Sequence, residues 1–520
     1  MDTLDLPMGR VDRQRPPTRV PDRPGDPRPH AVVIGAGFGG LAAAVRLGAR
    51  GYRVTVLEKL DAPGGRAFVF RQDGFTFDAG PTIITVPHVF EELWTLAGRR
   101  MSDDIDLHEL DPFYRISLAD GRFIDVCRDE DEMRARVEAL FPGEGAGFVR
   151  FQAECRRLCD LAFLGQGDRP MHDPLGMAKL APDLLTHGAL RSVHGLAAKY
   201  VRDPGLRAIL SFHPLLIGGN PFATTAVYAL IPELERRWGV HFAMGGTGAL
   251  VKGLAGLIAG QGGTLCCGAE VDEIVTSGRR AVGVRLASGE TVAADLVVSN
   301  ADPGWTYGHL LRRTDRRRWT DRRVARARYS MSLFVWYFGT DRRYEDVPHH
   351  SILLGPRYRG LLEDIFRRGV LADDFSLYLH RPTATDPALA PPGHDAFYVL
   401  SPVPNLAAGI DWEAAAEPYR RRIEAHLSAT VLPGLERSVV TSRVVTPPYF
   451  RDSLNTPLGA GFSLQPLLTQ SAWFRPHNRS EELERLYLVG AGTHPGAGVP
   501  GVLCSAKILD AVVPHADAIR

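Results

Sequence analysis

The sequence has few cysteines, no excess of either charge and no long uninterrupted hydrophobic run. Six cysteines in 520 residues are too few for a disulfide scaffold, and no two are spaced as Cys-x-x-Cys, so we expect reduced thiols and no metal site. The 61 basic and 60 acidic residues nearly balance, which argues against nucleic acid as a partner. The uncharged window 208–232 is broken by Pro214 and Pro221, so no membrane-spanning helix is expected.

Residues 1–29 contain seven prolines among arginines and aspartates, without the continuous apolar core of a signal peptide. We predict a disordered tail here, with a polyproline segment that binds a partner as the alternative. The rest of the chain is long enough for about two or three domains, at roughly 100–200 residues each.

The first ordered segment predicts a strand, a helix and a second strand. A short apolar run at 31–34 is typical of a buried strand, and 39–50 is rich in Ala and Leu until Gly51 ends the helix. Residues 53–58 then form the second strand. This β-α-β order indicates the start of a doubly wound α/β sheet.

Later segments alternate between helical and strand patterns. Residues 111–240 look mostly helical and irregular, whereas 282–286 and 291–298 flank the turn signal Ser288-Gly289 and predict a hairpin. Further predicted elements are strands at 333–338, 375–380, 396–400 and 486–489 and a helix at 412–432. We therefore expect a discontinuous nucleotide-binding domain (30–110, 240–303 and 480–520) and a substrate domain built from 111–239 and 304–479.

The strongest local motif is Gly-x-Gly-x-x-Gly at 35–40. Gly35 permits a tight turn, Gly37 lets the backbone approach a pyrophosphate, and Gly40 lets the helix pack closely on the strand. Glu58 ends the second strand, where an acid binds ribose hydroxyls. Because this motif follows a strand and opens a helix, it predicts a dinucleotide site rather than a chance glycine turn.

Other motifs resemble one family. Gly64-Gly65-Arg66 resembles the second glycine motif of the FAD-containing amine oxidase and phytoene desaturase superfamily, and 488–502 resembles the C-terminal signature of bacterial-type phytoene desaturases. Similar segments occur at 211–222, 298–302, 334–339, 380–382 and 471–478, so the resemblance runs from about 31 to 506. Ala491 stands where many related FAD enzymes have an acid, so contacts there must come from the backbone.

The resemblance implies an α/β fold with a Rossmann-like, GR2-type, discontinuous FAD-binding domain. It also implies a mixed α+β substrate domain and a helical membrane-associating region. The expected FAD contacts are Gly35, Ala36, Gly37, Phe38, Gly39, Gly40, Glu58, Lys59, Gly65, Arg66, Gly80, Pro81, Thr82, Val271, Asn300, Gly492, Gly501 and Val502.

The implied activity is FAD-dependent desaturation of phytoene, a C40 hydrocarbon, to neurosporene or lycopene, with oxygen or a quinone as electron acceptor. A hydrocarbon offers no polar handle, so its binding requires a long apolar channel. Candidate wall residues are Phe212, Phe222, Tyr228, Phe334, Trp336 and Tyr337. His494 is the first candidate for a proton acceptor and His213 the second, and catalysis without a side-chain base is the alternative.

Two segments are candidates for contact with a membrane, where such a substrate is stored. Residues 171–200 combine apolar and basic side chains and predict an interfacial amphipathic helix, with a solvated surface helix as the alternative. Residues 312–328 are densely basic around Trp319 and predict a solvated helix face, with attraction to anionic lipid as the sharper hypothesis. The expected location is cytoplasmic, peripherally bound to the inner membrane.

Three other functions fit parts of the sequence. A carotenoid cis–trans isomerase or carotenoid oxidase shares the FAD architecture. A prenyl-binding escort protein shares a related fold without using flavin, but the intact glycine motifs and Glu58 favour a working flavin site. An NAD-dependent dehydrogenase of a small polar substrate would require polar catalytic pairs, which the sequence does not display.

Overall fold

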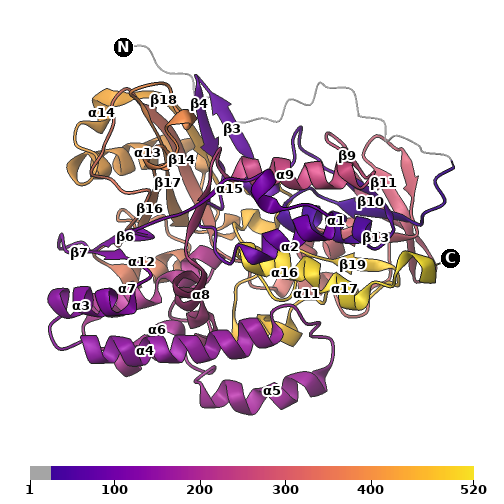
Figure 1. Cartoon of the computed structure of the whole chain (residues 1–520), viewed down its shortest axis with the longest axis horizontal. Helices are drawn as coiled ribbons and strands as arrows, with labels where there is room; N and C mark the ends of the chain where they lie inside the picture. Colours follow the sequence, from indigo (N-terminus) through magenta and orange to yellow (C-terminus); the bar gives the residue numbers. More distant parts are fainter. Residues whose placement is uncertain (1–24, 520) are drawn as a thin grey trace.

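The computed structural model describes residues 25–519, so the predicted tail lies outside the described residues up to residue 24. Three distant parts of the chain meet in one parallel sheet (Figure 1). Its order is β19 (Leu486–Leu488), β13 (Leu296–Ser299), β1 (His30–Ile34), β2 (Arg53–Leu57) and β9 (Thr264–Cys266).

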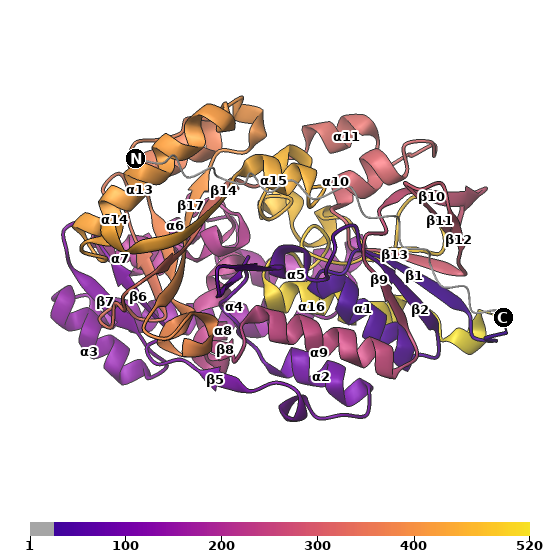
Figure 2. The ribbon, with the colours of Figure 1, turned by 90° about the horizontal axis from the view of Figure 1, so that it is seen from above.

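Strand alternation explains how this sheet is covered on both faces. Ala31 and Val33 point to one side and pack against α1 (Phe38–Ala49), α9 (Thr247–Gly260) and α16 (Val499–Lys507). Their neighbours Val32 and Ile34 point to the other side. There they meet the antiparallel strands β10 (Val271–Ser277), β11 (Arg280–Leu286) and β12 (Thr291–Ala293) (Figure 2).

The predicted strand–helix–strand unit and the hairpin are confirmed, but the strand expected at 291–298 is two strands. Its first part, β12, pairs antiparallel with β11, and its second part, β13, pairs parallel with β1. Asp295 lies between them and accepts a hydrogen bond from the backbone N–H of His30. The chain therefore changes sheets at this residue.

A seven-stranded sheet forms the second layer. Its order is β18 (Val439–Val445), β14 (Ser332–Thr340), β17 (Asp395–Val403), β16 (Leu377–His380), β15 (His350–Leu353), β6 (Tyr114–Ser117) and β7 (Phe123–Val126). Helix α13 (Trp412–Ala429) covers one face. Residues 111–240 are mostly helical, as predicted, and the short strands β6 and β7 are the part of this range that joins the sheet.

The third layer is helical and contains the segment expected to meet a membrane. Its helices are α3 (Glu130–Leu140), α4 (Gly145–Leu158), α5 (Pro174–Thr186), α6 (Val193–Tyr200), α7 (Pro204–Ser211) and α8 (Ile231–Trp238). The single helix predicted within 171–200 is wrong. Gly188 adopts a left-handed backbone after α5, and the Ser192 side chain caps the separate helix α6.

The basic segment 312–328 is also different from its prediction, because only α11 (Asp321–Arg326) is helical. Trp319 is buried and stacks on Tyr307 with the ring centroids 5.5 Å apart. The Glu482 carboxylate accepts the backbone N–H groups of residues 317–319, and Glu481 accepts the Trp319 indole N–H. Glu481 and Glu482 thus hold this segment against the rest of the protein.

Within residues 25–519, none of the helices combines the length and the apolar character needed to cross a bilayer.

Candidate active site

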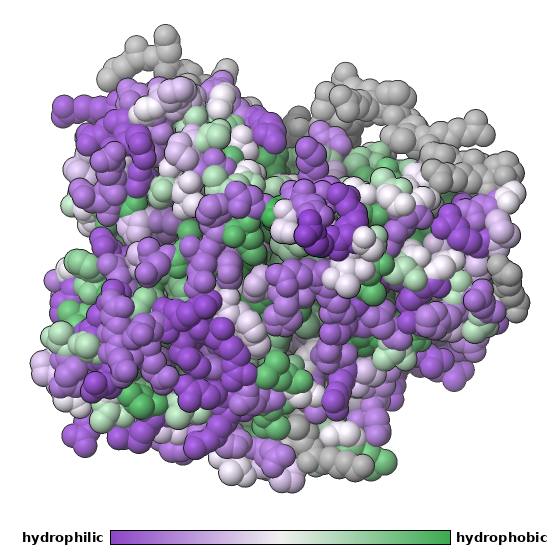
Figure 3. Space-filling model, in the orientation of Figure 1, coloured by the Kyte–Doolittle hydropathy of each residue, from purple (hydrophilic) through white to green (hydrophobic). Residues whose placement is uncertain are grey.

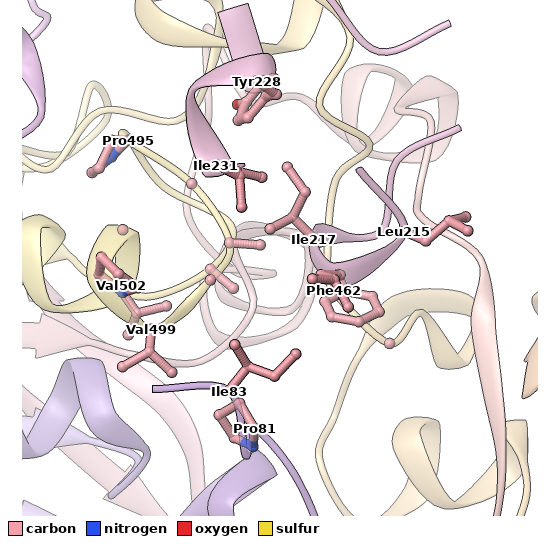
Figure 4. A pocket seen from close by; sticks show the side chains of 18 of the residues that line it. Pro81, Ile83, Leu215, Ile217, Tyr228, Ile231, Phe462, Pro495, Val499 and Val502 are labelled. Carbon is pink, nitrogen blue, oxygen red and sulfur yellow. The ribbon is translucent and has the colours of Figure 1, made fainter. Parts of the chain in front are cut away.

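One large cavity lies where the parallel sheet, the seven-stranded sheet and the helical layer meet. Its wall includes Pro81 and Ile83 from the N-terminal part, Ile217 and Ile231 from the helical layer, and Val502 from α16. Figure 4 shows these side chains arranged around one space. Segments more than 400 residues apart in sequence therefore build a single, mainly apolar site.

The glycine turn forms one end of this cavity. Gly37, Phe38 and Gly39 line it where α1 begins, and the side chain of Asn300 lies against the turn. A Cβ atom at Gly40 would be 2.0 Å from the carbonyl oxygen of Gly35, so helix and strand approach each other more closely than a side chain permits. The free N–H groups at the start of α1 suit a phosphate.

Glu58 closes the turn from the side. Its carboxylate accepts the backbone N–H of Ala36 at 2.7 Å and that of Leu60 at 2.9 Å. Burial raises the pKa of Glu58, and these backbone hydrogen bonds offset part of that shift. Lys59 turns away from the cavity, because its ammonium group donates to the Asp452 carbonyl and the Asn455 side chain.

Arg66 supplies the cation in the wall. Its Nε donates to the Gly461 carbonyl at 2.7 Å, whereas its buried Nη2 has no hydrogen-bond partner among the described residues. Burial lowers the pKa of Arg66, and the Asp302 carboxylate partly offsets this effect. Gly65 has a positive φ of 58°, which directs the chain past Gly37 and places Arg66 at the cavity. A free guanidinium N–H here suits an anionic or carbonyl oxygen.

The segment after β4 (Phe75–Asp78) forms the next part of the wall. Gly80, Pro81 and Thr82 all line the cavity. The Thr82 hydroxyl lies 2.6 Å from the Tyr398 hydroxyl and 2.8 Å from that of Tyr378, so this loop is tied to the seven-stranded sheet.

The C-terminal segment closes the same end. Gly501 and Val502 line the cavity in the first turn of α16, and a Cβ atom at Gly501 would be 2.8 Å from the Gly496 carbonyl oxygen. Gly492 does not line the cavity, although its neighbour Ala491 does. A Cβ atom at Gly492 would be 2.2 Å from the Pro303 side chain, so this glycine is required for packing.

The remaining predicted contacts divide into two groups. The predicted contacts that build the turn behind the wall are Gly35, Ala36, Gly40, Glu58 and Gly65. Val271 instead is buried in the core between the sheets, and Lys59 faces another segment. The predicted contacts that line the cavity are Gly37, Phe38, Gly39, Arg66, Gly80, Pro81, Thr82, Asn300, Gly501 and Val502.

The two predicted proton acceptors differ in position. His494 lines the cavity, but burial lowers its pKa to about 4, so it is a weak base at neutral pH. His213 does not line the cavity. It lies behind the wall with its Nε2 3.0 Å from the Tyr114 hydroxyl and 3.2 Å from Glu235 Oε2.

The predicted aromatic wall is wrong in four of six positions. Phe212 and Tyr228 line the cavity, whereas Phe222, Phe334, Trp336 and Tyr337 do not. Strand alternation in β14 explains two of the four, since Phe334 and Trp336 point toward α13 whereas Leu333 points to the cavity. Aliphatic side chains make up most of the wall instead.

Sequence reasoning missed Glu235, which lines the cavity and is 2% exposed. Its Oε2 accepts the Tyr114 hydroxyl at 2.7 Å, and its Oε1 has no hydrogen-bond partner among the described residues. The motif Ile-Pro-Glu-Leu-Glu-Arg-Arg reads as a surface helix, and only the spatial proximity of β6 distinguishes Glu235 from Glu233.

A buried histidine cluster was missed as well. One ring nitrogen from each of His349, His350 and His380 lies within 4.8 Å of the others. His349 and His380 contact each other through Nε2 at 3.1 Å, and His350 Nδ1 lies 2.8 Å from the hydroxyl of the cavity residue Tyr378. Burial lowers the pKa of His350 well below its usual value, so the ring is neutral. The absence of a metal site stays a prediction.

The residues at the glycine end fit FAD. The turn around Gly37 and Gly39 leaves room for backbone to approach a pyrophosphate, Glu58 lies at the end of β2, and Arg66 has a free donor at the cavity. The N-terminus of α16 adds backbone N–H groups. The cavity then continues from this end between apolar walls.

Comparison with known proteins identifies the family. The family described as flavin containing amine oxidoreductase matches residues 38–508. A neurosporene-forming phytoene desaturase of Cereibacter sphaeroides is 50% identical over 94% of this chain and 95% of its own, and a lycopene-forming one of Pseudescherichia vulneris is 48% identical over 92% and 97%. Cyclohexylamine oxidase from Brevibacterium oxydans shares the fold, with a TM-score of 0.60 and 17% identity over 95% of this chain and 99% of that one. The chain belongs to the bacterial phytoene desaturases within the flavin containing amine oxidoreductase family and is an FAD-dependent oxidoreductase.

Proposed function

We propose that this protein desaturates phytoene in successive steps and releases neurosporene or lycopene. The observation that carries the proposal is identity near 50% over almost the whole chain to desaturases that form these two products. The apolar cavity next to the glycine turn agrees with a long hydrocarbon substrate. The product and the number of steps are part of the proposal.

FAD, when bound, supplies an acceptor for a hydride from a substrate carbon. The protein contributes the apolar wall, which binds the hydrocarbon by removing its surface from water at about 25 cal/mol per Å². Leu215, Ile217 and Phe462 form part of this wall (Figure 4). Because the wall is apolar, the substrate is free to slide, and successive bonds then reach the same reactive end.

We propose that the helical layer contacts a membrane surface around α5. Met177 and Leu184 of α5 line the cavity, while Leu175 on the same helix is 68% exposed and Leu190 just beyond it is 72% exposed. Figure 3 shows hydrophobic residues at the surface along the lower edge of the molecule. Figure 1, in the same orientation, shows that α5 lies at this edge. The side chains of Lys179, Leu180 and Leu185 lie outside the described residues. This arrangement supports peripheral attachment to a membrane and direct entry of substrate, and the cytoplasmic side of the inner membrane is the location that we propose.

The experiment is to incubate the FAD-loaded protein with phytoene in liposomes and to separate the products by chromatography. Coloured polyenes that require FAD but no nicotinamide support desaturation, and their chromophore length counts the steps. Oxygen and a soluble quinone, supplied separately, distinguish the two proposed electron acceptors. Conversion of a cis carotenoid alone would favour the isomerase, and failure to bind FAD would favour an escort protein.

A further inference from the structure

Each desaturation removes two hydrogens from neighbouring carbons. One leaves with its bonding pair to the oxidant, and the other leaves as a proton while its bonding pair becomes the new double bond. That proton is released inside a wall that consists mainly of aliphatic side chains and glycine. A group in the wall that accepts a proton is therefore of direct value to the reaction.

Glu235 is the one carboxylate among the described residues that line the cavity. The other ionisable groups there are Arg66, which is a cation, His494, which burial makes a weak base, and the phenols of Tyr228, Tyr378 and Tyr398. Burying a carboxylate costs free energy, because an isolated charge away from water is strongly disfavoured. Its presence in a hydrocarbon-binding wall points to a function.

The position of Glu235 follows from its helix. On α8, Ile231, Leu234 and Glu235 line the cavity, and Ile231 is one helical turn before Glu235. Figure 4 shows Ile231 pointing into the space that Val499 and Val502 border. Glu233 lies on another face, where it is paired with Arg236 at 2.8 Å and Arg237 at 3.1 Å.

Two neighbours hold one carboxylate oxygen, and the other is buried without a hydrogen-bond partner among the described residues. Oε2 accepts the Tyr114 hydroxyl at 2.7 Å and lies 3.2 Å from Nε2 of His213. Burial and the Glu235 charge raise the pKa of Tyr114 well above its usual value, so Tyr114 remains a donor. The hydroxyl of Tyr114 donates to Oε2, so this hydrogen bond fixes the orientation of the carboxylate.

We infer that Glu235 is the proton acceptor of the desaturation, with Oε1 receiving the proton, and that Tyr114 and His213 are positioning residues that orient the carboxylate. This inference rests on the proposed function. It also assigns a place to His213, which acts through Glu235 rather than on the substrate.

The test compares Glu235→Gln and Glu235→Asp with the matched control Glu233→Gln, all as FAD-loaded proteins with phytoene in liposomes. Single-turnover desaturation under anaerobic conditions is expected to fall by about 10²–10⁴-fold in Glu235→Gln. The aspartate variant is expected to retain part of the rate, because it keeps a carboxylate. Glu233→Gln is expected to keep the wild-type rate per folded molecule, although it loses thermal stability.

A second readout separates chemistry from folding. Infrared difference spectra of one anaerobic turnover are expected to show a protonated carboxyl band in the wild type that is missing in Glu235→Gln. FAD content and phytoene binding are expected to be unchanged in that variant. A Glu235→Gln rate within threefold of wild type, or a carboxyl band that persists, overturns the inference. A wild type that leaves phytoene unchanged overturns the proposed function instead.

Discussion

The Oδ1 atom of Asn300 occupies the space that a side chain on Gly39 would require, since a Cβ atom there would lie only 2.5 Å from it. The same Cβ would be 3.1 Å from the backbone of Gly490. The strand ends of β13 and β19 thus meet the start of α1 at this point. The first, middle and last thirds of the chain depend on one glycine for their junction.

Replacing Gly39 by alanine should therefore disrupt the cofactor end of the cavity. We expect weaker FAD binding and a lower Tm, because Asn300 and the Gly490 backbone must move apart. Gly256→Ala is the matched control, since it lies in α9 and a Cβ there meets nothing within 4 Å. Alanine at an open helical site should stabilise the protein by up to about 1 kcal/mol. FAD titration by fluorescence and thermal unfolding measure both effects, and equal FAD affinity in the two variants would contradict the packing argument.

Sequence reasoning predicted the local fold around the glycine turn, which depends on neighbours in the chain, while the FAD contacts of these residues stay predictions. The glycine turn, Glu58 and Arg66 are local motifs, and their backbone conformations follow from glycine itself. It failed where contacts are long-range. The carboxylate of Glu235 accepts a hydrogen bond from Tyr114, which is 121 positions away, and no sequence pattern within α8 predicts that contact. The prediction of one helix over 171–200 was wrong because the helix end at Gly188 was not recognised, and the wall positions Phe334 and Trp336 were wrong because strand alternation was not used.

Mutations on the two faces of β14 test directly which side of this strand lines the cavity. Phe334 is fully buried toward α13, so Phe334→Ala should lower the free energy of unfolding by about 3–5 kcal/mol without changing the products. Leu333 lines the cavity, so Leu333→Ala should shift the ratio of desaturation products as well as stability. Chemical denaturation and product chromatography measure the two outcomes. A changed product ratio in Phe334→Ala alone would reverse the assignment of the faces.

His494 should make the fold sensitive to mild acid. Burial lowers its pKa to about 4 from a usual value of 6.5, so the unfolded chain binds this proton first as the pH falls. The contribution of neutral His494 to the free energy of unfolding is therefore fully present above pH 6.5. This contribution, on the order of 3 kcal/mol, is lost as the pH falls from 6.5 to 4. Denaturant unfolding at several pH values should show a shallower pH dependence for His494→Gln than for wild type. The exposed His515, changed to Gln, is the control, and a wild-type slope in both variants would contradict this role.

The membrane proposal predicts that lipid binding depends on the exposed leucines at α5. Leu175 and Leu190 are the most exposed large hydrophobic residues of the described chain, at 68% and 72%. Changing both to Gln should reduce binding to liposomes, because two apolar side chains that enter the lipid interface contribute about 1.5–3 kcal/mol each when fully buried. Fold and FAD content should not change, since neither side chain is packed in the core.

Val440→Gln is the matched control, because Val440 is 51% exposed on β18 at the opposite end of the molecule (Figure 1). Liposome sedimentation measures binding, and desaturation of phytoene solubilised in detergent measures the chemistry separately. If the double variant binds liposomes as tightly as Val440→Gln does, substrate enters by another route. If it loses liposome binding but keeps its activity in detergent, α5 is the contact through which the hydrocarbon reaches the cavity.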